Sequence, residues 1–248
     1  MKKIVIISPV KNIERVHHTF VSVAQDKNIQ LEFKGVEQGL EGVATYFDRT
    51  IIAPEIVRLA YQAEQNGAAA VIINCLAEPG LQAAKELLSI PVIGIFEASL
   101  QAITVAQKRL SILLPKFHDN YLKILQETIK ARDLKNLLTE FYRINIEEPE
   151  EKKKSAVTTA IKDAINHSQV IILSSTYLAQ YQDYCQEIID ATNDSVSLIV
   201  PLIASIRYVE KIFNGTQRYD KENLLPPNTG KVSQWYEEVS ESRSYEFA

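Results

Sequence analysis

Apolar runs without polar alternation recur along this chain and predict buried parallel strands. Residues 68–73 (AAAVII) contain no polar position, which is typical of a strand covered by helices on both faces. Segments with helical spacing separate this run from others like it, so the pattern predicts a parallel α/β fold. The predicted strands are residues 4–8, 30–34, 71–74, 92–95, 110–114, 141–146, 170–173 and 197–200.

The second half of the chain repeats the order of the first. KKIVIISPV (2–10) and KRLSILLPK (108–116) are strand patterns that reach a proline, and FEASLQAI (96–103) parallels LIASIRYV (202–209). Four elements in the same order indicate an internal duplication. Ligands of open parallel sheets collect beyond the carboxyl ends of the strands, so two such halves facing each other predict a cleft between them.

Composition narrows the choice of partners. The 248 residues are 46% hydrophobic and 23% charged, which is enough for a substantial core. A net charge of −4 with interspersed signs gives no basic field, so we expect a small-molecule partner and no nucleic acid. No run reaches the roughly 18 apolar residues of a membrane span, and the opening run is shorter than the roughly 7–15 residues of a signal-peptide core. We therefore expect a cytoplasmic protein without membrane contact and with both cysteines free.

Cys75 is the strongest candidate for chemistry in the chain. It follows the predicted strand at 71–74 and precedes Pro79-Gly80 and the helical pattern LQAAKELL, which places it at a strand-to-helix junction. The free N–H groups and the dipole of a helix N-terminus favour a thiolate over a thiol. A buried structural cysteine fits the position equally well.

Residues 74–99 resemble the hydantoin racemase branch of the aspartate/glutamate racemase superfamily. The family's first catalytic cysteine lies in a Cys-x-x-Asp-Pro-Gly-Leu segment, and this chain has CLAEPGL (75–81), followed by IPVIGI (90–95) and EAS (97–99). Weaker agreement extends along most of the first 210 residues. The resemblance implies cofactor-independent proton transfer next to a carbonyl group by two cysteines, one from each lobe.

The resemblance also implies an architecture, an α/β fold of two pseudo-twofold-related, doubly wound parallel-sheet lobes with the active-site cleft between them. The last helix of the family crosses back to the first lobe, and we place it at residues 204–213. The expected units are residues 1–97 with 204–213, residues 98–203, and a C-terminal extension at 214–248. In this extension, VSQWYEEV (232–239) predicts an amphipathic helix that docks on its own lobe or on a neighbouring subunit of a homo-oligomer.

The second thiol of the family is missing. Alignment on the strand at 171–173 puts Ser174 and Ser175 where the family has glycine and the second cysteine, so Ser175 stands for that thiol. A hydroxyl is a far weaker acid and base than a thiol. Cys185 belongs to a spacing that predicts the core face of a helix, so we interpret it as structural. That face is formed by Tyr177, Tyr181, Tyr184 and Ile188.

The remaining candidates are contacts to the substrate. Where the family commonly has Asn-Pro-Asn after its first strand, this chain has Ser8-Pro9-Val10, so hydrogen-bonding capacity is lost. His118 follows a predicted strand and is a candidate for a thiol–imidazole pair. No metal-ligand spacing or glycine-rich phosphate loop occurs, so no cofactor is expected. The expected substrate-binding residues are Ser8, Pro9, Asn12, Tyr46, Leu76, Ser174 and Thr176.

The charged segment EEPEEKKKS (147–155) predicts a solvated helix start, and a binding role is not expected there. Proline and glutamates suit the first helical turn, because its free N–H groups favour negative charge.

Together these features favour a hydantoin-racemase-like enzyme with Cys75 as the base and Ser175 in the second position. The expected substrate is a small carboxylate or a cyclic imide such as a 5-substituted hydantoin, whose C–H is acidic enough for bound water to return the proton. A single-cysteine decarboxylase or cis-trans isomerase of the same superfamily is the second hypothesis. The third is a catalytically degenerate protein that binds a small metabolite or serves in assembly.

Overall fold

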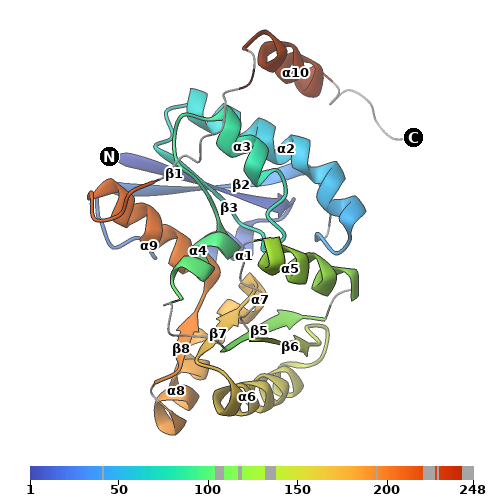
Figure 1. Cartoon of the computed structure of the whole chain (residues 1–248), viewed down its shortest axis with the longest axis vertical. Helices are drawn as coiled ribbons and strands as arrows, with labels where there is room; N and C mark the ends of the chain where they lie inside the picture. The colour runs from blue at the N-terminus through green and yellow to red at the C-terminus, as the bar shows by residue number, and fades with distance from the viewer. Residues whose placement is uncertain are drawn as a thin grey trace.

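A computed structural model describes residues 1–40, 42–103, 109–116, 119–131, 138–193, 195–219, 227 and 229–241. Within these residues the chain forms two parallel four-stranded sheets (Figure 1). We call the unit around the first sheet the first lobe and the unit around the second sheet the second lobe. No helix among the described residues is long and apolar enough to cross a membrane.

The first sheet has the strand order β2-β1-β3-β4. In Figure 1 the helices α2 and α3 lie above this sheet and α4 lies below it, so its central strands are covered on both faces. The side chains of β3 are all fully buried, as the unbroken apolar run predicts. The elements are β1 (Lys2–Val10), α1 (Glu14–Phe20), β2 (Ile29–Leu40), α2 (Tyr46–Gln65), β3 (Ala70–Ile73), α3 (Leu81–Leu87), β4 (Val92–Gly94) and α4 (Ile95–Gln101).

The second sheet repeats this arrangement with the order β6-β5-β7-β8. All the strands expected from the apolar runs are present, although β2 extends farther than expected, to Leu40. The elements are β5 (Arg109–Pro115), α5 (Asp119–Ala131), β6 (Leu138–Ile144), α6 (Glu150–His167), β7 (Val170–Leu173), α7 (Thr176–Ala179), α8 (Gln182–Thr192), β8 (Ser197–Ile199), α9 (Pro201–Phe213) and α10 (Thr229–Glu241).

The strand registers of the two sheets match residue for residue. In the first lobe Ile7 of β1 pairs with Ile73 of β3. In the second lobe Leu113 of β5 pairs with Leu173 of β7. The next backbone hydrogen bond is the same in both lobes: the N–H groups of Asn74 and Ser174, each one residue beyond its strand, donate to the carbonyl oxygens of Ile7 and Leu113 at 2.8 and 2.9 Å. The predicted pseudo-twofold arrangement is therefore confirmed.

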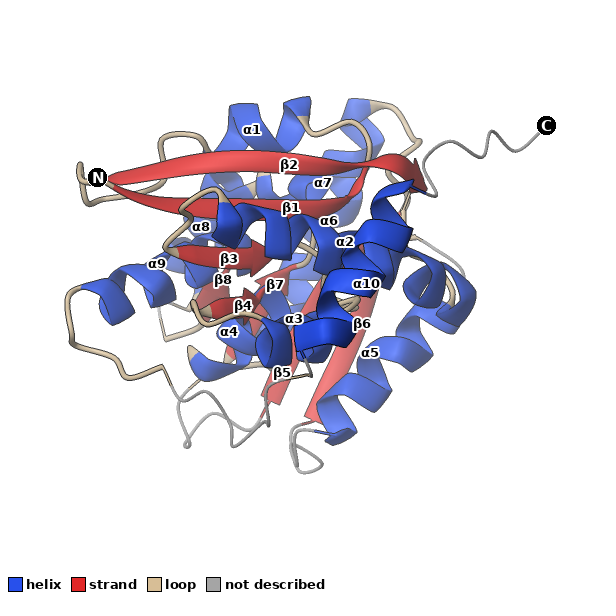
Figure 2. Cartoon of the chain, turned by 90° about the horizontal axis from the view of Figure 1, so that it is seen from above, coloured by secondary structure: helices blue, strands red, loops and turns tan. Residues whose placement is uncertain are grey.

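Helix α9 leaves the second sheet and returns to the first lobe, where it packs against α4, β3 and β4. Its sequence begins with Pro201 at the first helical turn, three residues earlier than the expected start. Figure 2 shows the same path from above, with α9 and α4 beside each other. This crossover supports the division into residues 1–97 with 204–213, residues 98–203 and the extension, which stays a prediction.

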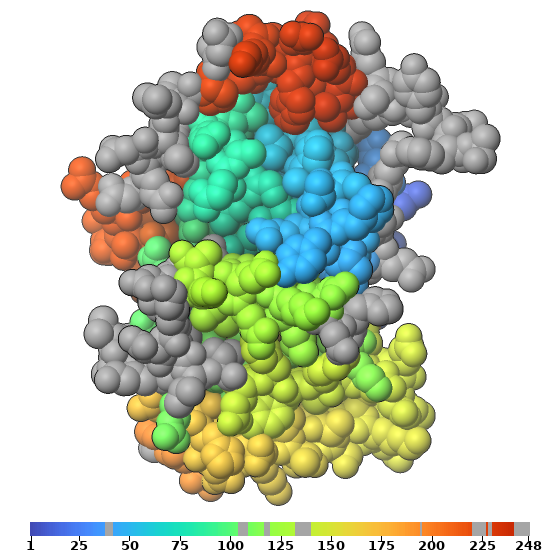
Figure 3. Space-filling view, turned by 45° about the vertical axis from the view of Figure 1, so that its right-hand side comes forward, coloured from blue at the N-terminus to red at the C-terminus, as the bar shows by residue number. Residues whose placement is uncertain are grey.

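The C-terminal helix α10 packs on α2 of the first lobe. The ring of Tyr236 lies 5.1 Å from that of Tyr61, and the half-buried Trp235 packs against the core. In Figure 3 α10 covers the end of the first lobe, and α5 of the second lobe meets α2 where the two lobes join. The amphipathic spacing thus predicted a docked helix correctly.

Candidate active site

Cys75 lies two residues beyond the end of β3, in a tight turn. The backbone N–H of Glu78 donates to the Cys75 carbonyl at 3.0 Å. The N–H groups of Ala77 and Glu78 also donate to the Cys75 sulfur. The thiol side chain is half-buried, so the turn holds the sulfur at the carboxyl edge of the sheet with two amide donors directed at it.

Glu78 holds this turn in place. It is the one non-glycine residue with positive φ among the described residues, at 47°, a conformation that costs free energy. Its buried carboxylate accepts a 2.8 Å hydrogen bond from the Glu97 N–H in the first turn of α4, where Gly94 offers no capping side chain. Any side chain at Gly94 would collide with this carboxylate. Glu97 in turn pairs with the buried Lys85 at 2.6 Å.

The expected thiolate character of Cys75 is wrong. The pKa of the Cys75 thiol is raised to about 11, and burial is the largest cause. The hydrogen bond from the Ala77 N–H lowers this pKa, whereas the negative charge of Glu78 raises it further. Helix α3 begins only at Leu81 and has seven residues, so its N-terminus is too far along the chain and too short to offset burial. The thiol form of Cys75 is therefore favoured at neutral pH.

Ser175 is the register equivalent of Cys75, because each lies two residues beyond the strand pairs Ile7–Ile73 and Leu113–Leu173. Its hydroxyl accepts a 3.4 Å hydrogen bond from the Leu178 N–H and caps α7. The neighbouring Ser174 is 7% exposed, and its hydroxyl has no hydrogen-bond partner among the described residues.

Cys185 is fully buried within α8, and burial raises the pKa of its thiol to about 12. The structural interpretation of this cysteine is confirmed. The predicted single helix is wrong, however, because the chain breaks between α7 and α8, and Tyr177 lies exposed on α7 instead of in the core.

The structure brings only some of the expected substrate contacts toward Cys75. Ser8 is buried and accepts a 2.9 Å hydrogen bond from the Asn74 amide, next to Cys75. Pro9 and Leu76 are buried beside these residues along the chain. His118 lies outside the described residues.

The other expected contacts have different surroundings. The exposed Asn12 accepts a 3.0 Å hydrogen bond from the Glu14 N–H at the start of α1. Tyr46 is 38% exposed at the start of α2, and its hydrogen bond to Glu127 of α5 raises the pKa of the phenol. Thr176 lines a pocket that Cys75 does not reach.

The structure adds two residues that no motif pointed to. Tyr121 of α5 is 5% exposed; burial raises its pKa well above the ordinary value, and the charge of a Cys75 thiolate raises it further. The second lobe therefore presents a neutral hydroxyl near Cys75. Arg49 of α2 is half-buried, and its charge lowers the pKa of Cys75. The contact between α2 and α5 brings Tyr121 and Arg49 together near Cys75. A contact between lobes cannot be predicted from local sequence patterns.

Charged side chains of the described residues form no cluster suited to a metal ion. The groups found near Cys75 are two amide donors, a buried phenol and a cation.

Comparison with known proteins identifies the family of this chain. The family model for Asp/Glu/hydantoin racemases matches residues 10–209. A hydantoin racemase from Pseudomonas sp. (strain NS671) is 22% identical over 218 residues, which cover 85% of each chain. The structure of allantoin racemase from Klebsiella pneumoniae is similar with a TM-score of 0.78 at 20% identity, over 92% of this chain and 95% of that one. Unliganded arylmalonate decarboxylase gives a TM-score of 0.62 at 14% identity, over 91% and 100%. The chain belongs to the Asp/Glu/hydantoin racemase family.

Proposed function

We propose that this protein catalyses cofactor-independent proton transfer at a carbon next to a carbonyl group of a small cyclic imide or carboxylate. The observation that carries the proposal is the register equivalence of Cys75 and Ser175, which puts one thiol and one hydroxyl at corresponding edges of the two sheets. Relatives named as hydantoin and allantoin racemases support a cyclic, nitrogen-containing substrate.

In the racemase reaction the Cys75 thiolate removes the proton from the substrate carbon, and the electron pair moves to the carbonyl oxygen. Water on the Ser175 side then gives a proton to the opposite face, and the hydroxide that remains takes up the proton of the Cys75 thiol, which restores the thiolate. The buried Tyr121 near Cys75 stays neutral, so it adds no negative charge that would oppose the developing enolate. The positive charge of Arg49 favours the thiolate and the enolate alike.

Two serines complete the proposed substrate site. The buried, unpartnered Ser174 hydroxyl is suited to a polar group of the substrate, because its burial is otherwise unfavourable. Ser8 reaches the site through its hydrogen bond with Asn74. A homo-oligomer in the cytoplasm, without a cofactor, is part of the same proposal and is supported by the family and by the two free cysteines.

A single-cysteine decarboxylase is the second candidate, and the raised pKa of Cys75 favours it. In that reaction the bond to the carboxylate carbon breaks, carbon dioxide leaves, and the electron pair remains as an enolate. The Cys75 S–H then gives its proton to the carbon. This reaction needs a protonated thiol on one face only, so it requires no second cysteine.

The experiment compares the two reactions with one protein preparation. A resolved 5-substituted hydantoin is followed by optical rotation, and an arylmalonate by release of carbon dioxide, with wild type, Cys75→Ala and Cys185→Ala. Loss of rotation that requires Cys75 supports the racemase. Release of carbon dioxide alone supports the decarboxylase. If neither substrate class reacts, the catalytic proposal is overturned in favour of a binding or assembly role.

A further inference from the structure

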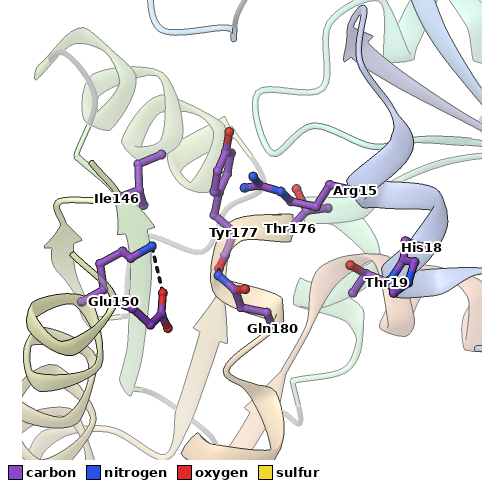
Figure 4. Close-up of a pocket in the computed structure, with 9 residues that line it drawn as sticks. Arg15, His18, Thr19, Ile146, Glu150, Thr176, Tyr177 and Gln180 are labelled. Carbon is purple, nitrogen blue, oxygen red and sulfur yellow. Dashed lines mark hydrogen bonds and ion pairs between the residues drawn. The ribbon is translucent and has the colours of Figure 1, made fainter. Parts of the chain in front are cut away.

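A pocket of about 450 Å³ lies between the two lobes, outside the residues described around Cys75. Helix α1 of the first lobe supplies Arg15, His18 and Thr19 on one side (Figure 4). The start of α6 and helix α7 of the second lobe form the other side. A volume of this size suits a small metabolite.

The pocket carries an unbalanced positive charge. The Arg15 guanidinium stacks on the Tyr177 ring, 3.7 Å from its centroid, and has no carboxylate partner among the described residues. The other cation, Lys153, already pairs with Glu150 at 3.0 Å, and Glu150 also accepts a hydrogen bond from Tyr181. Stacking on an aromatic face leaves the edge of the guanidinium free to donate hydrogen bonds.

Neutral donors surround this charge. Gln180 is held in place because its amide donates to the Tyr177 carbonyl at 2.8 Å. Thr19 and Thr176 line the same space, and their hydroxyls have no hydrogen-bond partner among the described side chains, while α6 begins here without a side-chain cap. The charged segment 147–155 is the largely exposed start of α6, as expected, and the absence of a binding role there stays a prediction.

We propose that this pocket binds a carboxylate group of a small molecule, with Arg15 as its main contact. The planar guanidinium matches the two oxygens of a carboxylate. A dianion such as phosphate fits less well, because Glu150 also lines the pocket and leaves about one net positive charge from Arg15. Arg15 and Tyr177 come from different lobes, so the bound carboxylate stabilises their contact.

The carboxylate has two possible sources. Thr176 directly follows Ser175, so the pocket adjoins the proposed substrate site, and an acidic substituent of the substrate can supply the group. A separate carboxylate-bearing molecule can also supply it. The first source rests on the proposed function, and the second does not.

The test begins with binding, which needs no turnover. Succinate and the uncharged succinamide are titrated by NMR into the full chain, into Arg15→Gln and into the matched control Arg218→Gln, an exposed arginine outside the pocket. We expect succinate, but not succinamide, to bind, with affinity reduced at least tenfold in Arg15→Gln and unchanged in Arg218→Gln. Circular dichroism checks folding, and Arg15→Lys, which keeps the charge without the planar fork, should show an intermediate affinity.

Kinetics separate the two sources. If the substrate carries the carboxylate, Arg15→Gln raises KM for hydantoin-5-acetate about tenfold more than it raises KM for 5-methylhydantoin. If a separate molecule carries it, succinate binds alongside both substrates and changes both rates. Equal succinate affinity in folded wild type and Arg15→Gln overturns the proposal. Succinate binding without any turnover overturns the proposed function and leaves this inference standing.

Discussion

The protonation state of Cys75 determines whether this residue can donate a proton or accept one. Burial raises the pKa of this thiol to about 11, above the free-thiol value of about 8.5. A raised pKa means that the thiol form persists through neutral pH and is lost only as the pH rises through about 11. At neutral pH most Cys75 thiols can therefore donate a proton, whereas only the small thiolate fraction of Cys75 can remove one from a substrate.

Alkylation of Cys75 should follow the same titration. With Cys185→Ala as background, the iodoacetamide rate is expected to rise about tenfold per pH unit between pH 7 and 10, because only the thiolate reacts. Mass spectrometry of the labelled peptide measures the rate. If the alkylation rate instead reached half its maximum at or below the pKa of a free thiol, the buried, high-pKa environment described for Cys75 would be contradicted.

We predict that Ser175 limits exchange on the second face of the substrate. We expect Ser175→Cys to increase racemisation of a resolved 5-substituted hydantoin by about tenfold or more, because a thiol is a far better proton donor than a hydroxyl. Optical rotation gives the rate, and Ser174→Cys is the neighbouring control. An unchanged rate in a folded Ser175→Cys protein that retains Cys75 would mean that the second position does not face the reacting carbon.

At the scale of elements, the turn between β3 and α3 depends on one buried carboxylate. Glu78 caps α4 through the Glu97 N–H, and its charge also raises the pKa of Cys75. Glu78→Gln keeps an acceptor for this N–H but removes the charge. The pH profile of Cys75 alkylation should therefore shift to lower pH, while the fold is retained.

Glu86→Gln is the matched control for this variant. Glu86 lies on α3, and its side chain makes no hydrogen bond or ion pair with the described residues. Its alkylation profile should match wild type. A Glu78→Gln profile that stays in place or moves to higher pH would contradict the electrostatic role of Glu78.

Helix α10 should contribute to stability through Trp235. Only half of this side chain is buried, so Trp235→Ala is expected to lower the free energy of unfolding by about 1–3 kcal/mol, less than for a core tryptophan. Urea titration followed by circular dichroism measures the change. Wild-type tryptophan emission should move to longer wavelength on unfolding, and emission already at the water-exposed position would refute the docking.

At the scale of the whole molecule, local sequence patterns predicted the two sheets that carry the candidate site, but they did not predict the protonation state of Cys75. The unbroken apolar runs and their repetition predicted both sheets, because strands depend on neighbours in the sequence, and the family resemblance predicted the equivalence of Cys75 and Ser175. The protonation of Cys75 escaped prediction since it depends on burial and on a helix that starts six residues later. Tyr121 and Arg15 escaped because each acts across the contact between the lobes.

The two lobes meet at α2 and α5 and again at α1 and α7, and we propose that the Cys75 thiol and the Ser175 hydroxyl face one substrate between the lobes. The central claim is that Cys75 alone carries the proton transfer between them. Entry of solvent deuterium at the ring carbon of a 5-substituted hydantoin, measured by mass spectrometry in D₂O at pH 9, tests it most directly. We predict exchange with wild type and Cys185→Ala and none above the uncatalysed rate with Cys75→Ala. Equal exchange in a folded Cys75→Ala protein would contradict the account.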